Sequence, residues 1–173
     1  MKSMSALAIT VATVASVIAC MVTASGQADE KSIPVYLSKI PAGYRDWRLV
    51  SVAHEEGSLH SFAAVLGNDI AIKAYREGKL PFPDGTILVA LHYSHAPSEE
   101  NNKAFGDEQS FVPGSPTNIQ VEVKDSKKYA ATGGWGFGHF STDRKPGADA
   151  LLKTCAPCHA KASGDFIFTR YAP

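Results

Sequence analysis

The sequence predicts an α+β fold that is mainly an antiparallel β-sheet with short flanking helices. Two observations lead to this prediction. Several strand-length segments alternate apolar and polar residues or are almost wholly apolar, and turns rich in glycine, proline and aspartate separate them. The helix-like segments are short and do not alternate regularly with the strands, as they would in a parallel α/β fold.

The first two strands are expected at residues 46–54 (DWRLVSVAH) and 86–93 (TILVALHY). In the first segment, Trp47 is expected to anchor the strand in the core. The second segment is a nearly continuous apolar run of strand length, which is typical of a central strand.

Two further strands are expected at residues 118–124 (NIQVEVK) and 133–140 (GGWGFGHF). In the former, alternation predicts one set of side chains in the core (Ile119, Val121, Val123) and the other in solvent (Gln120, Glu122, Lys124). The latter alternates large residues with glycine. This pattern predicts a strand whose glycine face lets another group approach closely.

Short helices are expected at residues 69–78 and 146–153. In the first, Asp69 can cap the amino end and Gly78 the carboxyl end. The remaining segments are expected to be an extended arm (27–40), a long polar loop (97–117) and an aromatic tail that packs back on the domain (165–171).

Near its end the chain carries the motif Cys155-Ala156-Pro157-Cys158-His159. C-x-x-C-H is the attachment signature of a c-type haem. Each thiol can add to one haem vinyl group, and the two-residue gap places both sulfurs along one haem edge. His159 is then expected to bind the iron as the proximal ligand. The motif therefore predicts a covalently attached haem c at the carboxyl end of the fold.

A C-x-x-C pair can also be a redox dithiol, half of a zinc site or a disulfide. A dithiol motif normally opens a helix after a strand in an α/β pattern, which the sequence does not show. A structural zinc site needs a second ligand pair, and the third cysteine of the chain, Cys20, lies in the amino-terminal segment. Haem attachment is the favoured interpretation.

Residues 1–26 are predicted to be a signal peptide, which leaves a haem c domain at residues 27–173. The segment has a basic Lys2, an apolar stretch and a small-x-small cleavage site ending at Gly26. A periplasmic location follows, because bacteria attach c-type haem outside the cytoplasm. The alternative is a lipoprotein anchored at Cys20, within the lipobox-like sequence VIAC. Basic and acidic residues are equal in number, 17 each, and form no dense basic run, so no nucleic-acid partner is expected.

The second axial ligand of the iron can be narrowed by elimination. All three methionines, Met1, Met4 and Met21, precede the cleavage site, so the mature domain would contain none. This excludes a His/Met electron carrier. Three alternatives remain. One is a five-coordinate haem that binds nitric oxide or hydroxylamine, and another is a bis-His electron-transfer haem that uses His54, His60, His92, His95 or His139. The third, which is uncommon, is ligation by a lysine.

Several other residues are candidates for the haem pocket. His92 and His139 lie on the two clearest strands. Trp135 and Phe137 are expected to pack in the core or against the haem. Arg170 and Arg144 are candidates for pairing with the haem propionates, or are solvated surface arginines.

Four segments together resemble the cytochrome P-460 family over residues 33–173: PAGYRDWRLV, FPDGTILV, GGWGFGHF and CAPCHAKASGDFIFTRYAP. The resemblance implies a mostly antiparallel β-structure with a C-terminal haem that is five-coordinate, with His159 proximal. Characterised relatives oxidise hydroxylamine. The partners expected for this chain are accordingly a small ligand such as hydroxylamine or nitric oxide and a redox partner cytochrome. The related cytochrome c′-beta proteins share the fold and bind nitric oxide without turnover. Relatives are often homodimers.

The sequence departs from the hydroxylamine-oxidising members at one position. Those members cross-link the haem to a lysine on the strand after D-G-T, and this position corresponds to Ala90. Alanine cannot form such a bond, so oxidation and simple ligand binding both remain open as functions. Strand alternation places Leu88 and His92 on the same face as Ala90. His92 is therefore expected to hydrogen-bond a bound ligand or a propionate.

Overall fold

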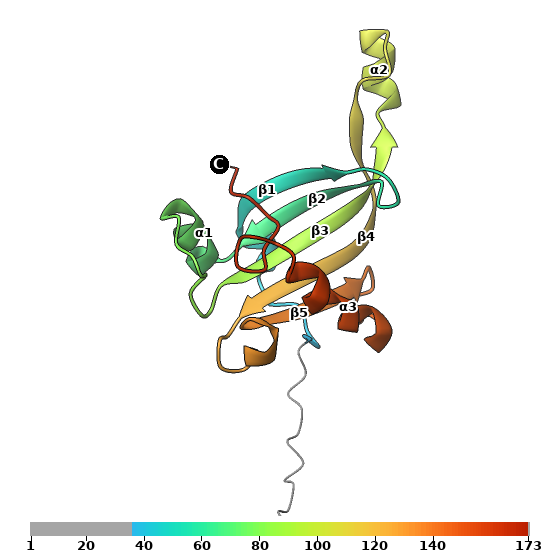
Figure 1. Ribbon diagram of the computed structural model, residues 1–173. Helices are drawn as coiled ribbons and strands as arrows, with labels where there is room; N and C mark the ends of the chain where they lie inside the picture. The colour runs from blue at the N-terminus through green and yellow to red at the C-terminus, as the bar shows by residue number, and fades with distance from the viewer. Residues whose placement is uncertain (1–35, 173) are drawn as a thin grey trace, which may run out of the picture. The chain divides into compact units, whose positions relative to one another are not determined.

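A computed structural model of the chain describes residues 36–172, and these form an antiparallel sheet with short helices (Figure 1). Five strands follow one another in the order β1-β2-β3-β4-β5. They are β1 (Arg48–Glu55), β2 (Ser61–Gly67), β3 (Ile87–Pro97), β4 (Phe111–Lys124) and β5 (Trp135–Ser141). The helices are α1 (Asp69–Arg76), α2 (Glu99–Phe105) and α3 (Asp149–His159), with 3-10 turns at Tyr44–Asp46 and Ala130–Thr132. The predicted α+β class is confirmed.

The predicted signal peptide, residues 1–26, lies outside the described residues, as do Cys20 and most of the predicted arm, 27–40. The described end of that arm runs beside β5, where Tyr36 forms a bridge with Phe137. None of the described helices is long and apolar enough to span a membrane.

Strand β2 was not predicted from the sequence. Its residues, SFAAVLG, are mostly small and apolar, and the alternation of buried and half-buried side chains becomes visible only once β2 pairs with both β1 and β3. Because antiparallel pairing supplies hydrogen bonds on both sides, a weak local pattern is enough to form a central strand.

The predicted polar loop at residues 97–117 is wrong. Ser98 caps the start of α2, where its hydroxyl accepts a hydrogen bond from Asn101 N, and Gly106 ends the helix with a φ of 77°. The following residues from Phe111 already belong to β4, which pairs with the outer part of β3. Helix α2 therefore lies at the tip of an extended β3–β4 hairpin (Figure 1).

The capping residue of α1 also differs from the prediction. The side chain of Asn68, rather than that of Asp69, accepts the hydrogen bond from Ala71 N at 2.9 Å. Asn68 can do this because its backbone is extended, whereas Asp69 is already helical. Gly78, just beyond the helix, has a φ of 60°, in keeping with its predicted place at the carboxyl end.

The two faces of the sheet carry separate apolar clusters. One cluster includes Val89, Leu91 and Phe140, and the segment before β1 covers it through Tyr44. The other includes Leu88, Trp135 and Phe137 together with residues of α1, α3 and the C-terminal tail. Trp47, the predicted core anchor, is only half-buried at the margin of the first cluster.

Other side chains of this protein pack closely against the glycine face of β5. A Cβ at Gly136 would overlap the ring of Tyr129, and one at Gly138 would meet Phe140 and Leu37. The close approach predicted for this face therefore comes from Tyr129 and the amino-terminal arm. The opposite face of β5 carries Trp135 and Phe137, which belong to the cluster of α3 and the C-terminal tail.

Gln120, Glu122 and Lys124 do not point into solvent as predicted. Gln120 and Glu122 are half-buried, and Lys124 is only 5% exposed. They face the side of the sheet that α3 and the tail cover. Alternation correctly separates the residues of β4 into two sets, but both faces of the sheet are covered.

Candidate haem site

The cysteine motif lies within α3, which packs against β5 (Figure 1). The helix extends to His159, six residues beyond the predicted end at residue 153. Cys155 and Cys158 are three residues apart on the helix, so their thiols lie on one side of it. Both thiols are free, Cys158 is exposed and Cys155 is half-buried. Burial raises the pKa of the Cys155 thiol, and the charge of Glu122 adds to this shift.

The imidazole of His159 is oriented through its Nδ1 atom. Nδ1 lies 2.9 Å from the carbonyl oxygen of Phe166 and 2.9 Å from Oε1 of Glu122. Burial lowers the pKa of His159, but the hydrogen bond and charge of Glu122 outweigh it, so the pKa is raised above 6.5. A metal-binding histidine normally donates its second ring N–H in this way, which leaves Nε2 for the metal.

Two cavities, called here the haem-side cavities, adjoin His159 on the sheet face that carries Gln120 and Glu122. The smaller, of about 170 Å³, lies between α3 and strands β4 and β5, and both motif cysteines line it. The larger, of about 250 Å³, lies between strands β1–β4 and tail residues 168–170. His159, Gln120 and Glu122 line both cavities.

The residues around these cavities fit a haem. Two free thiols stand at the edge of one cavity, and an imidazole with a satisfied Nδ1 stands between the two. Ala63 and Ala90 supply small side chains on the wall of the larger cavity. His139 lines the smaller cavity, and its buried Nδ1 has no hydrogen-bond partner among the described residues. Such an atom is one that a bound group can satisfy.

Alternation along β3 places its residues as predicted, because Leu88, Ala90 and His92 all line the larger cavity. His92 is 8% exposed, and its Nδ1 lies 3.5 Å from Oε2 of Glu55. Burial lowers the pKa of His92, and the charge of Glu55 partly opposes this shift.

The other predicted pocket residues are divided among several places. Phe137 lines the smaller cavity, and its ring centroid is 4.8 Å from that of His159. Arg170 lines the larger cavity and also a third cavity of about 450 Å³ beside α1. Trp135 is fully buried in the core and lines neither haem-side cavity. Arg144 lies over the ring of Tyr44, beside the other apolar cluster.

Three of the five candidate second histidines lie away from His159. His54 and His95 stack with ring centroids 4.5 Å apart, and His95 Nδ1 is 3.2 Å from Nε2 of His60. None of the three lines either haem-side cavity. His92 and His139 are the two that do.

Sequence reasoning missed Glu122, Gln120, Glu55 and Phe168 as residues of this site. The alternation of β4 indicated that Gln120 and Glu122 share a face, but it assigned that face to solvent. The proximity of Glu55 and Phe168 depends on strand pairing and on the path of the tail, for which the sequence carries no local signal.

No curated protein matches the chain. A family model described as "Cytochrome P460" matches residues 41–169, which include all five strands, the three helices and the cysteine motif. The match agrees with the antiparallel sheet. The chain therefore belongs to the cytochrome P460 family, and this membership implies a haem cofactor.

Proposed function

We propose that this protein is an exported, periplasmic c-type cytochrome whose single haem is five-coordinate and binds or oxidises small nitrogen compounds such as hydroxylamine and nitric oxide. The observation that carries the proposal is the larger cavity beside His159. Among residues 36–172, no lysine and no methionine lines it, and its one histidine besides His159 is His92, whose Nδ1 faces Glu55.

The residues of the motif would hold the cofactor. The thiols of Cys155 and Cys158 would add to the two vinyl groups, and Nε2 of His159 would bind the iron. The Phe166 carbonyl and the Glu122 carboxylate accept the proton of Nδ1 and so keep the ring in one tautomer. When bound, the haem supplies an open coordination position and a change of oxidation state.

The larger cavity would admit the small ligand. Ala90 leaves room on its wall, and His92 offers a polar nitrogen that can hydrogen-bond a ligand or a propionate. Oxidation of hydroxylamine would also need an external electron acceptor, for which a redox partner cytochrome is the proposed class.

Ala90 favours a second candidate function, in which the protein binds gas without turnover, like cytochrome c′-beta. The nearest lysines in sequence, Lys79 and Lys103, line neither cavity. Lys124 is buried on the same side of the sheet, but its Nζ contacts Asp165. A lysine cross-link to the haem is therefore not available at the position where the hydroxylamine-oxidising members have one.

Optical spectra of the purified holoprotein test the proposal. We expect a high-spin ferrous haem that changes its spectrum when nitric oxide is added. A sharply split low-spin ferrous spectrum that nitric oxide leaves unchanged would instead mean bis-His ligation and electron transfer.

Turnover of hydroxylamine with an artificial electron acceptor then separates an enzyme from a gas-binding protein. A Cys155→Ala/Cys158→Ala variant is the control, because acid extraction should remove its haem but not that of the wild type.

A further inference from the structure

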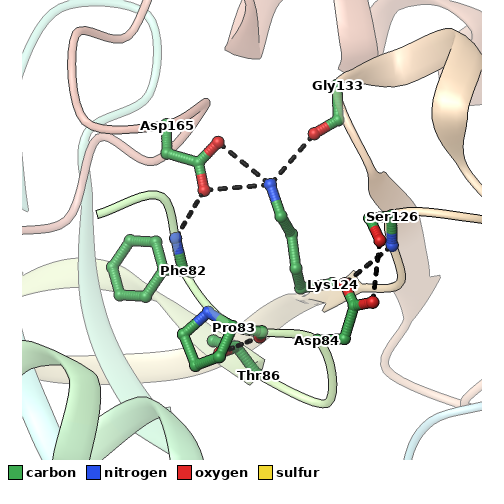
Figure 2. Close-up of polar contacts among 8 residues, drawn as sticks. All are labelled: Phe82, Pro83, Asp84, Thr86, Lys124, Ser126, Gly133 and Asp165. Atoms are coloured by element: carbon green, nitrogen blue, oxygen red, sulfur yellow. Dashed lines mark hydrogen bonds and ion pairs between the residues drawn. The ribbon is translucent and has the colours of Figure 1, made fainter. Parts of the chain in front are cut away.

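A buried ion pair joins the end of β4 to the segment that follows the cysteine motif (Figure 2). Lys124 Nζ lies 3.0 and 2.9 Å from the two carboxylate oxygens of Asp165, and it donates to the Gly133 carbonyl at 3.0 Å. The side chains of Lys124 and Asp165 are only 6% and 14% exposed. Asp165 Oδ2 also accepts a hydrogen bond from Phe82 N at 2.8 Å. The pair is thus fully hydrogen-bonded and held by three separate segments.

The ion pair holds an unusual turn. Asp165 and Phe166 have φ angles of 54° and 69°, in the left-handed region that residues other than glycine seldom adopt. Two such residues in succession persist only where their surroundings fix them. Lys124 and Phe82 N fix Asp165. The ring of Phe166 lies so close to Gly133 that a Cβ there would overlap it.

This turn presents the Phe166 carbonyl to His159. The carbonyl oxygen lies 2.9 Å from Nδ1, and the Glu122 carboxylate lies at the same distance from the same nitrogen. A neutral imidazole has one N–H to donate when its other nitrogen binds a metal. The two acceptors therefore share one proton, and a displacement of the carbonyl away from Nδ1 increases the share of the carboxylate.

We propose that the Lys124–Asp165 ion pair is a positioning device that controls which acceptor His159 uses. By fixing the turn at residues 165–166, it holds the neutral Phe166 carbonyl against Nδ1. This limits how far the Nδ1 proton is shared with the charged Glu122 carboxylate. A carboxylate partner makes a ligating imidazole a stronger electron donor than a carbonyl partner does. The ion pair thereby keeps electron donation from His159 to the iron weaker than it would be with Glu122 as the main partner. This inference rests on the proposed function, in which His159 binds the iron.

A purely structural role for the pair makes a different prediction. Buried ion pairs contribute little net stability compared with apolar residues of similar volume. If Lys124 and Asp165 only filled space, their joint replacement by neutral side chains of similar size would leave the haem unchanged once the protein folds. A positioning role instead requires that the iron–histidine bond change.

The test uses the holoprotein with the double change Lys124→Met/Asp165→Asn. Asparagine tolerates the left-handed backbone, so the turn can still form but is no longer held by the charge of Lys124. We expect a higher iron–histidine stretching frequency in resonance Raman spectra of the ferrous protein. We also expect the ratio of ferric to ferrous haem to rise about tenfold, which is a reduction potential about 59 mV more negative. In a Glu122→Gln background the upward shift should disappear.

The matched control is Lys145→Met/Asp143→Asn, which breaks the exposed pair between Lys145 and Asp143 with the same two kinds of substitution and the same unchanged net charge. Should the double variant fail to fold, the near-isosteric Asp165→Asn change alone should give a smaller rise in the iron–histidine stretching frequency. The proposal is overturned if the frequency and the potential of the folded variants equal those of the control, or if both move in the opposite direction. Absence of covalent haem or of an iron–histidine band in the wild type would instead refute the proposed function.

Discussion

At the scale of single residues, the site combines charged and apolar groups around His159. Glu122 and the Phe166 carbonyl meet at Nδ1, while the rings of Phe137 and Phe168 lie 4.8 and 5.3 Å from the imidazole by their centroids. The ring of Phe137 is buried, so it shields one side of the imidazole from water and lowers the local dielectric constant there. The polar contacts to Nδ1 are stronger there than they would be in water.

Ala90 provides a residue-scale prediction for ligand access. Ala90→Leu adds three carbon atoms to the wall of the larger cavity, and overpacking of this kind costs about 1–3 kcal/mol. We therefore expect nitric oxide to bind the ferrous protein about tenfold more weakly, as measured by optical titration. Ala104→Leu, the same change on the exposed side of α2, should leave the affinity unaltered. Equal affinities in both variants would show that the ligand does not use this cavity.

At the scale of elements, the side chain of Asn68 connects α1 to the sheet by hydrogen bonds. Asn68 caps α1 through Oδ1, which also lies 3.2 Å from Ile87 N, and its Nδ2 donates to the Gly85 carbonyl at 2.8 Å. A single amide thus connects the start of the helix to the start of β3. The helix contributes Ala71, Ile72 and Ala74 to the apolar cluster beneath the site.

Asn68→Ala should lower the free energy of unfolding by about 2 kcal/mol, the upper part of the range for a lost helix cap, because its bonds to β3 are lost too. The comparison is Asp69→Ala, since Asp69 is the residue that the sequence pattern selects as the cap. Its side chain is 91% exposed, so we expect a change below about 0.5 kcal/mol. Urea unfolding followed by circular dichroism measures both, and similar losses would contradict this assignment.

The cluster of histidines shared by β1, β3 and the β1–β2 turn should make stability sensitive to pH. Desolvation lowers the pKa of His95, as do the charges of His54 and His60, while Glu56 opposes the shift. A lowered pKa means that the unfolded chain binds the proton more readily, so stability is complete above about pH 6.5 and declines as the pH falls below it. His95→Asn should flatten this decline in urea unfolding measured between pH 7 and 5. An identical slope would exclude His95 as its source.

At the scale of the whole molecule, the sheet separates an apolar core on one face from the candidate haem site on the other. One face packs against the segment before β1 and forms an apolar core, while the other carries the two cavities beside His159, α3 and the tail. The tail crosses back over the sheet after α3, and Ala172 N donates to the Val50 carbonyl at 2.9 Å (Figure 1). The carboxyl end is thereby joined to the first strand.

Substitution of Phe140 tests whether the two faces of the sheet are independent of each other. It is fully buried in the core opposite the cavities, so Phe140→Ala should cost about 3–5 kcal/mol of unfolding free energy. The optical spectrum of the folded haem protein should nevertheless stay the same, because Phe140 lines neither haem-side cavity. If the alanine variant does not fold, Phe140→Leu serves instead. A shifted haem spectrum in either variant would show that the two faces are coupled.

Part of this site could be predicted from the chain alone, because its chemistry lies in short local patterns. The spacing of Cys155, Cys158 and His159 predicts haem attachment, and alternation along β3 correctly groups Ala90 with His92. The α+β class was predictable for the same reason, since turns and strand periodicity are local. Strand β2 and helix α2 were missed because their patterns are short and depend on their partners.

The tertiary structure decided which face of the sheet meets the site. Alternation along β4 sorts Gln120, Glu122 and Lys124 into one set, but only the folded position of α3 and the tail shows that this set is covered. The contact of Lys124 with Asp165 joins residues 41 positions apart, and the turn that it holds is left-handed at residues other than glycine. Sequence periodicity reports the relation between neighbours along one element, whereas such contacts arise from the packing of distant elements.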